Sequence, residues 1–114
     1  MKVAVIGSRG IYINDLERYL PDTTEEIVSG GAMGVDSCAA AYAEDNGIRL
    51  TVIRPEYDKY GKSAPIRRNI KIVEYADFVV AFWDGQSRGT KFVIDYCERT
   101  GRDIEVHYMT FDPA

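Results

Sequence analysis

The stretch Phe78-Val79-Val80-Ala81-Phe82 is the strongest strand signal in the chain, since all of its residues are apolar. A short, continuous apolar run is typical of a strand that is covered on both faces in a parallel sheet. The run Val3-Ala4-Val5-Ile6, which ends at Gly7, has the same character. Further strands are predicted around residues 26–28, 49–53 and 104–109, which makes five in all.

Helical patterns separate these strands. The first helix is predicted from near Asn14, where Glu17 completes a capping box, to the residue before Pro21. Later helices are predicted over about 34–46, from near residue 65, and over about 90–100, with a polar loop at 55–63 and a tail at 111–114. The helix that begins near residue 65 has an apolar stripe of Ile66, Ile70, Val73 and Ala76, which leaves off the stripe Arg67, Arg68, Lys71 and Glu74.

Five strands that alternate with four helices require right-handed, parallel crossovers. We therefore predict an α/β fold, a Rossmann-like three-layer sandwich with a five-stranded parallel sheet in the order 3-2-1-4-5, as a single domain over residues 1–114. Ligands of such sheets bind outside the carboxyl ends of the strands, where the strand order reverses. That point lies between the first and the fourth strand.

Charge and cysteine content disfavour several classes of protein. The 18 acidic residues outnumber the 14 basic ones and give a formal net charge of −4, which argues against a general nucleic-acid binder. Cys38 and Cys97 lie in apolar helical patterns without a CxxC motif, so we expect two buried thiols and no metal. There is no leader and no apolar run near about 20 residues, which predicts a cytoplasmic protein with no membrane partner.

Glycine and hydroxyl residues follow three of the predicted strands, at 7–10, 29–36 and 84–90. Glycine lets the backbone approach a ligand closely, and free amides at a helix N-terminus attract an anion. Arg9 and Arg88 would add charged hydrogen bonds to the same anion. Three such loops at one edge of a sheet predict a phosphate-binding site. None of them has a Walker A or GxGxxG pattern, and we predict no cofactor.

The charged candidates also have plain structural interpretations. Asp36 accepts ribose hydroxyls, or orients Arg9, or only complements the dipole of its helix. Asp84 is either an acid at the cleft or a turn residue. Arg67 and Arg68 either close over a phosphate or belong to a solvated basic face.

The aromatic candidates are equally open. Trp83, Tyr57 and Tyr60 either stack on a base or shield the ends of the strands. His107 is expected to be an ordinary strand residue rather than a catalyst.

Four groups of residues resemble, in this order, motifs of the SLOG superfamily, a Rossmann-like group: Gly7-Ser8-Arg9, Ser29-Gly30-Gly31-Ala32-Met33-Gly34-Val35-Asp36, Ala64-Pro65 with Arg68-Asn69, and Asp77 and Trp83-Asp84-Gly85 with Ser87 and Gly89-Thr90. The chain looks most like the small, stand-alone branch of the YspA type. The superfamily also includes the lonely-guy phosphoribohydrolases and DNA-processing protein A. The resemblance implies binding of nucleotides or nucleotide-derived molecules, often by a sensor.

The enzymes of that superfamily have a glycine-threonine step followed by a catalytic glutamate, and an arginine-lysine pair on the preceding helix. Here Gly89-Thr90 and Arg68 match, whereas Val93 stands in place of the glutamate and Asn69 in place of the lysine. Valine cannot transfer a proton, so the resemblance leans away from an enzyme. The remaining catalytic candidates are Asp84, Asp95 and Arg68.

We therefore expect a nucleotide-type phosphate ligand, bound by a sensor, carrier or sequestering protein. A nucleoside-monophosphate phosphoribohydrolase (an N-glycosidase) and a single-stranded DNA binder are the alternatives. A homodimer is expected through Tyr42, Phe92 and Tyr96, although these side chains could equally be core. The predicted ligand-binding residues are Gly7, Ser8, Arg9, Ser29, Gly30, Gly31, Ala32, Gly34, Asp36, Arg68, Asn69, Trp83, Asp84, Ser87, Arg88, Gly89 and Thr90.

Overall fold

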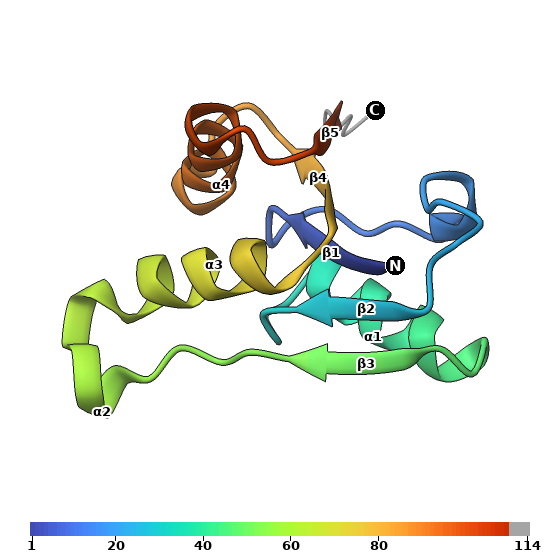
Figure 1. Ribbon diagram of the computed structural model, residues 1–114, viewed down its shortest axis with the longest axis horizontal. Helices are drawn as coiled ribbons and strands as arrows, with labels where there is room; N and C mark the ends of the chain where they lie inside the picture. The colour runs from blue at the N-terminus through green and yellow to red at the C-terminus, as the bar shows by residue number, and fades with distance from the viewer. Residues whose placement is uncertain (110–114) are drawn as a thin grey trace.

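The computed structural model describes residues 1–109, in which five strands form one sheet (Figure 1). The strands are β1 (Lys2–Gly7), β2 (Glu26–Ser29), β3 (Arg49–Val52), β4 (Phe78–Trp83) and β5 (Ile104–Tyr108). Their order is β3-β2-β1-β4-β5, and every neighbouring pair is parallel. The predicted α/β class and strand order are confirmed, while the predicted tail at 111–114 lies outside the described residues.

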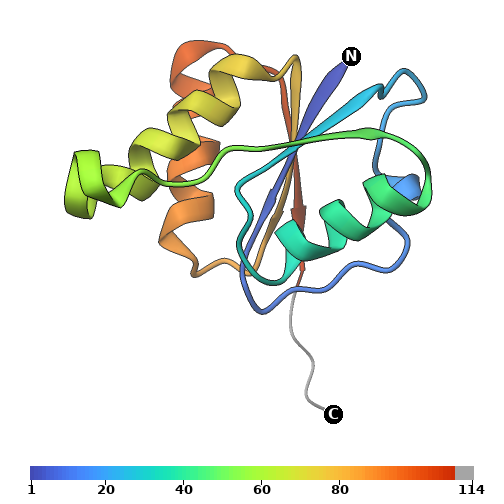
Figure 2. The ribbon, with the colours of Figure 1, turned by 90° about the horizontal axis from the view of Figure 1, so that it is seen from below.

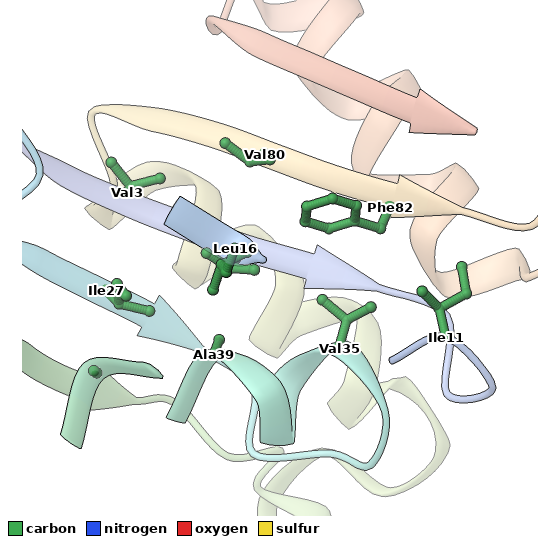
Figure 3. Close-up of a cluster of buried hydrophobic side chains, with 10 residues drawn as sticks. Val3, Ile11, Leu16, Ile27, Val35, Ala39, Val80 and Phe82 are labelled. Carbon is green, nitrogen blue, oxygen red and sulfur yellow. The ribbon is translucent and has the colours of Figure 1, made fainter. Parts of the chain in front are cut away.

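Alternate residues of the central strands face two separate cores. Val3 and Val5 of β1 belong to the core under α1 (Val35–Asp45), which Figure 3 shows together with Leu16 and Phe82. Ala4 of β1 belongs to the other core, under α3 (Ala64–Tyr75) and α4 (Arg88–Thr100). Figure 2 shows α1 on one side of the sheet and α3 with α4 on the other. Because both faces are covered, the loops at the carboxyl edge are the natural place for a site.

The first crossover lacks the predicted α-helix. The segment between β1 and β2 contains only a 3-10 turn, η1 (Leu16–Arg18), and its N-cap residue Asp15 makes no side-chain cap bond. A helix of so few residues before Pro21 has too few backbone bonds to offset its nucleation. The segment is anchored instead by Leu16, which is buried in the core under α1.

The segment 55–63, predicted as a polar loop, forms α2 (Tyr57–Tyr60) and η2 (Gly61–Ser63) and leads directly into α3. None of the helices in residues 1–109 combines the length and the apolar character that crossing a membrane requires.

The apolar stripe predicted for α3 is partly wrong. Ile66 is 46% exposed, whereas Ile72, Val73 and Ala76 are buried. Arg68, placed off the stripe by its charge, is half-buried and bonds to the loop after β2. The first turns of α3 thus present a polar side chain to the carboxyl edge of the sheet, although Ala64 at the start of the helix is buried as well.

The two cysteines differ in their surroundings. Cys97 is fully buried in the core under α3 and α4, and burial raises the pKa of its thiol to about 11. Cys38 is only half-buried, and its sulfur accepts a hydrogen bond from the Ile13 amide at 3.3 Å. The prediction of a buried thiol is therefore confirmed for Cys97 and is wrong for Cys38.

Candidate functional site

A cavity of about 420 Å³ lies where the loops after β1, β2 and β4 meet the first turns of α3. The carboxyl ends of parallel strands share one edge of the sheet, so loops far apart in sequence meet there. The residues that line it are Ile6, Gly7, Ser8, Arg9, Gly10, Gly30, Ala32, Asp36, Pro65, Arg68, Asn69, Ile72, Asp84, Ser87, Gly89 and Thr90. The structure thus brings together most of the residues predicted from the three loops.

The N-terminus of α4 points unpartnered amides at this cavity. Ser87 makes no side-chain cap bond, and the first backbone bond of the helix runs from the Lys91 amide to the Ser87 carbonyl at 3.2 Å. Among residues 1–109, no acceptor is bonded to the amides of residues 88–90. Free amides at a helix start, together with the helix dipole, favour an anion at this end of the cavity.

The turn before α4 is held by Asp84 and Trp83. One carboxylate oxygen of Asp84 accepts hydrogen bonds from the amides of Gln86 and Ser87, both at 2.8 Å. These bonds lower the pKa of Asp84 below its ordinary value, so the group is ionised at neutral pH. The indole N–H of Trp83 donates to the Ser87 carbonyl at 3.0 Å. The turn role foreseen for Asp84 is therefore present, and the same residue also lines the cavity.

Arg68 and Asn69 form the wall of the cavity contributed by α3. The Arg68 guanidinium donates to the Gly30 carbonyl at 2.7 Å through Nη1 and to the Asn69 Oδ1 at 2.8 Å through Nε. Because Oδ1 accepts this bond, the Asn69 amide nitrogen is left as a donor. That nitrogen lies 4.0 Å from where a Cβ at Gly89 would stand. A side-chain donor thus lies beside the start of α4.

Gly30 permits this close approach. A Cβ there would lie 2.6 Å from Arg68 Nη1 and 3.1 Å from Asp36 Oδ2. Any larger residue would push the guanidinium off the Gly30 carbonyl. The glycine at this position is therefore explained by the packing of charged side chains.

Asp36 is a buried carboxylate in the first turn of α1. It is 8% exposed, and its Oδ2 accepts a hydrogen bond from the Ala32 amide at 3.0 Å. Burial raises its pKa above the ordinary value, although the Ala32 bond and the charge of Arg68 oppose that shift. Burial likewise lowers the pKa of Arg68, against the charge of Asp36. The position of Asp36 in the first turn of α1 fits the dipole interpretation, and Asp36 also lines the cavity. A contact between Asp36 and a ribose stays a prediction.

Five predicted residues do not line the cavity. Ser29 is buried, and its hydroxyl accepts a hydrogen bond from the Gly31 amide at 3.3 Å. Gly34 has a φ of 73° at the start of α1, and a Cβ there would collide with the Arg9 carbonyl. The third of the five is Gly31, which has a φ of 75° and lines a neighbouring hollow instead. These three residues shape the loop after β2. The other two are Trp83, engaged as described, and Arg88, which is exposed on the first turn of α4.

Ile6, Gly10, Pro65 and Ile72 line the cavity without having been predicted. Ile6 belonged to a predicted strand, Gly10 to the glycine-rich loop at 7–10 and Pro65 to a helix start, whereas Ile72 lay outside the apolar stripe predicted for its helix. Only Pro65 could have been found, because a proline at the first turn of a helix locates the end of α3 that faces the carboxyl edge.

Other sequence candidates lie away from the cavity. The Arg67 guanidinium stacks over the Tyr60 ring at 4.5 Å, and Asp95 pairs with Lys91 at 3.0 Å on the exposed face of α4. His107 packs between Tyr19 and Phe82, with ring centroids 4.7 and 5.5 Å away, as a strand residue. Two further candidates are Tyr57, which is 57% exposed in a separate hollow on α2, and Val93, which is fully buried in the core.

The predicted dimer surface is divided between core and surface. Tyr42 packs against the core under α1, and Tyr96 packs against the core under α3 and α4 and also stacks on Phe92, with centroids 6.1 Å apart. The Tyr96 hydroxyl also donates to Glu74 at 2.9 Å. The homodimer stays a prediction.

A comparison of the chain with protein-family models and with curated proteins finds no match. The residues of the cavity therefore carry the functional inference.

Proposed function

We propose that this chain binds a nucleotide or a nucleotide-derived phosphate ligand in the cavity, as a sensor, carrier or sequestering protein. The observation that supports this most directly is the group of donors at one end of the cavity. The unpartnered amides at the start of α4, the Asn69 side-chain amide and the Arg68 guanidinium all belong to it. Phosphate accepts several such bonds at once.

The carboxylates of the cavity suit the sugar. Asp36 and Asp84 each have one oxygen bonded to backbone amides, which leaves the second oxygen of each as an acceptor. Hydroxyl groups of a ribose are donors of the right kind for such oxygens. The cavity thus offers donors for a phosphate at one end and acceptors for a sugar beside them.

Val93 supports binding rather than turnover. Its side chain is fully buried among apolar side chains in the core under α3 and α4. This position therefore lacks the glutamate that would transfer a proton in the enzymes of the SLOG superfamily. The ligand is expected to be released unchanged.

The direct test is a titration of the protein with inorganic phosphate, ribose 5-phosphate and the nucleoside mono-, di- and triphosphates. Ligand at 100 times its Kd should stabilise the fold by about 2.7 kcal/mol, which a thermal melt detects as a rise in Tm. Asn69→Ala should reduce this rise, whereas Lys91→Ala, on the exposed face of α4, should retain it. An unchanged Tm with every phosphate compound at millimolar concentration would reject the proposal.

A second candidate, N-glycosidic hydrolysis of a nucleoside monophosphate, is favoured by one observation. Two carboxyl groups line the same cavity, and the pKa of Asp36 is raised while the pKa of Asp84 is lowered. Such a divergence is a feature of acid and base pairs. Chromatography for free base after long incubation tests it. Base release that stops in Asp36→Asn and in Asp84→Asn supports turnover, and intact substrate at high protein concentration rejects it.

A further inference from the structure

A second hollow, of about 480 Å³, adjoins the cavity. The two share Arg9 and Ala32 as lining residues, so they lie next to one another along the loops after β1 and β2. The side chains that distinguish the second hollow are Tyr12 and Met33. Neither was singled out from the sequence.

The backbone holds these two side chains in place. Gly34 lies so close to the Arg9 carbonyl that only a glycine fits, which packs the loop that carries Met33 against the loop that carries Tyr12. The Ile11 amide donates to the Ser8 carbonyl at 3.2 Å and turns the chain directly before Tyr12. The two side chains are therefore presented by loops of defined conformation.

Both side chains are exposed to an unusual degree for their size and apolarity. Tyr12 and Met33 are each 66% exposed, beside a hollow that is also lined by Arg9 and Ser37. A tyrosine ring offers a flat surface for stacking, and a methionine thioether packs well on an aromatic ring.

The aromatic side chains that the sequence suggested for stacking are engaged elsewhere. Trp83 donates its indole N–H to the Ser87 carbonyl, and its ring lies against Tyr108 with centroids 5.4 Å apart. The face of Tyr60 is covered by the Arg67 guanidinium. Tyr57 lines a hollow that shares no residue with the cavity.

We infer that the hollow beside Tyr12 and Met33 binds the planar heteroaromatic base of the ligand. The inference rests on the proposed function: a phosphate at the start of α4 and a sugar beside Asp36 direct the rest of a nucleoside 5′-phosphate past Arg9 and Ala32 into this hollow. Tyr12 stacks on the base, and Met33 packs against it. The hollow therefore decides which base the protein prefers, while the cavity binds the part that all nucleotides share.

The test is isothermal titration of ribose 5-phosphate and of AMP, GMP, CMP and UMP into the wild type, Tyr12→Ala, Tyr12→Phe and Tyr57→Ala. Wild type should bind its best nucleoside monophosphate more tightly than ribose 5-phosphate. Tyr12→Ala should weaken that nucleotide by about 5- to 100-fold, the range for loss of one base-stacking aromatic. Tyr12→Phe keeps the ring and should retain the affinity. Because Tyr12 is exposed, an unchanged Tm without ligand confirms that the variants fold.

The ribose 5-phosphate series separates this inference from the proposed function. If ribose 5-phosphate binds equally to wild type and Tyr12→Ala while the nucleotide is weakened, the inference is supported. Equal affinity of ribose 5-phosphate and every nucleotide for the wild type overturns the base site and leaves the phosphate site standing. Equal weakening of both ligands by Tyr12→Ala, or weakening of the nucleotide by Tyr57→Ala alone, also overturns it. Failure of all of these compounds to bind the wild type overturns both.

Discussion

Two buried carboxylates, Glu26 and Asp36, lie toward opposite ends of the sheet and differ in how far the protein satisfies them. Glu26, at the amino end of β2, is 6% exposed and accepts hydrogen bonds from the Thr51 hydroxyl at 2.8 Å and from the Tyr75 hydroxyl. Arg49 lies 3.9 Å away. The bond from Tyr75 lowers the pKa of Glu26, whereas burial raises the pKa of Asp36.

This difference separates a structural cluster from a candidate site. The partners of Glu26 come from β3 and α3, so its carboxylate joins three elements and leaves its charge well compensated. Asp36 has one backbone partner at its Oδ2 and lies in a cavity where the amides at the start of α4 have no acceptor among the described residues. Buried polar groups are normally paired within the fold, and those left unpaired mark the place where a ligand completes the set.

The largest expected effect on stability comes from Glu26→Ala. This change removes the acceptor of two side-chain hydrogen bonds and leaves Arg49 without its carboxylate, so the free energy of unfolding should fall by about 2–3 kcal/mol. Urea unfolding measures it. Asp36→Asn tests the carboxylate of the other cluster. It removes a charge that burial disfavours, and it should leave stability equal or higher by up to about 1 kcal/mol. Similar losses in both variants would remove the distinction between the clusters.

Arg68 and Arg49, one from each cluster, should differ in their effect on ligand binding. Arg68→Ala removes a guanidinium that lines the cavity and orients Asn69, so affinity for a nucleoside monophosphate should fall by about 10- to 100-fold. Arg49→Ala removes a guanidinium beside Glu26, away from the cavity, and should leave the affinity unchanged. Calorimetric titration of both variants gives the comparison. A loss of affinity in Arg49→Ala equal to that in Arg68→Ala would point to a general charge effect.

The pH dependence of stability should distinguish the two carboxylates by sign. The folded-state pKa of Glu26 is lowered from its ordinary 4.5, so its stabilisation is present above that pH and is lost as the pH falls through the folded pKa. The pKa of Asp36 is raised from its ordinary 3.8, so its ionised form destabilises the fold at neutral pH, and acid relieves this. At pH 7 wild type should therefore exceed Glu26→Gln in stability and fall short of Asp36→Asn. Both differences should shrink as urea midpoints are measured from pH 6 toward pH 3, and constant differences would contradict the assigned shifts.

The sheet and the location of the cavity followed from the sequence because both depend on local signals. Continuous apolar runs such as 78–82 predict strands with two covered faces, and the position of the order reversal then follows from connection rules. The glycine-rich loops come directly after strands, so their meeting at one edge follows from the parallel arrangement. The cavity residues from these loops could be predicted for that reason.

What the sequence did not reveal depends on tertiary contacts. Ile66 and Arg68 are the clearest pair: hydropathy assigns the isoleucine to the core, but Arg68 is the one drawn inward, by the Gly30 carbonyl and by Asn69. Glu26 carried no signal, because its hydroxyl partners lie 25 and 49 residues further along the chain. The first predicted helix is absent because its helical pattern is weak and the burial of Leu16 determines the conformation of the segment instead.

The smallest expected effect isolates one bond of the Glu26 cluster. Thr51→Val keeps the branched shape that suits β3 and removes only the hydroxyl that donates to Glu26 at 2.8 Å, so it should lower the free energy of unfolding by about 1 kcal/mol. If the loss comes from this bond, Thr51→Val introduced into Glu26→Gln should have a different effect from the same change in wild type, as a double-mutant cycle in urea would measure. An identical loss in both backgrounds would assign it to the strand itself. The stabilising partners of Glu26 would then be Tyr75 and Arg49 alone.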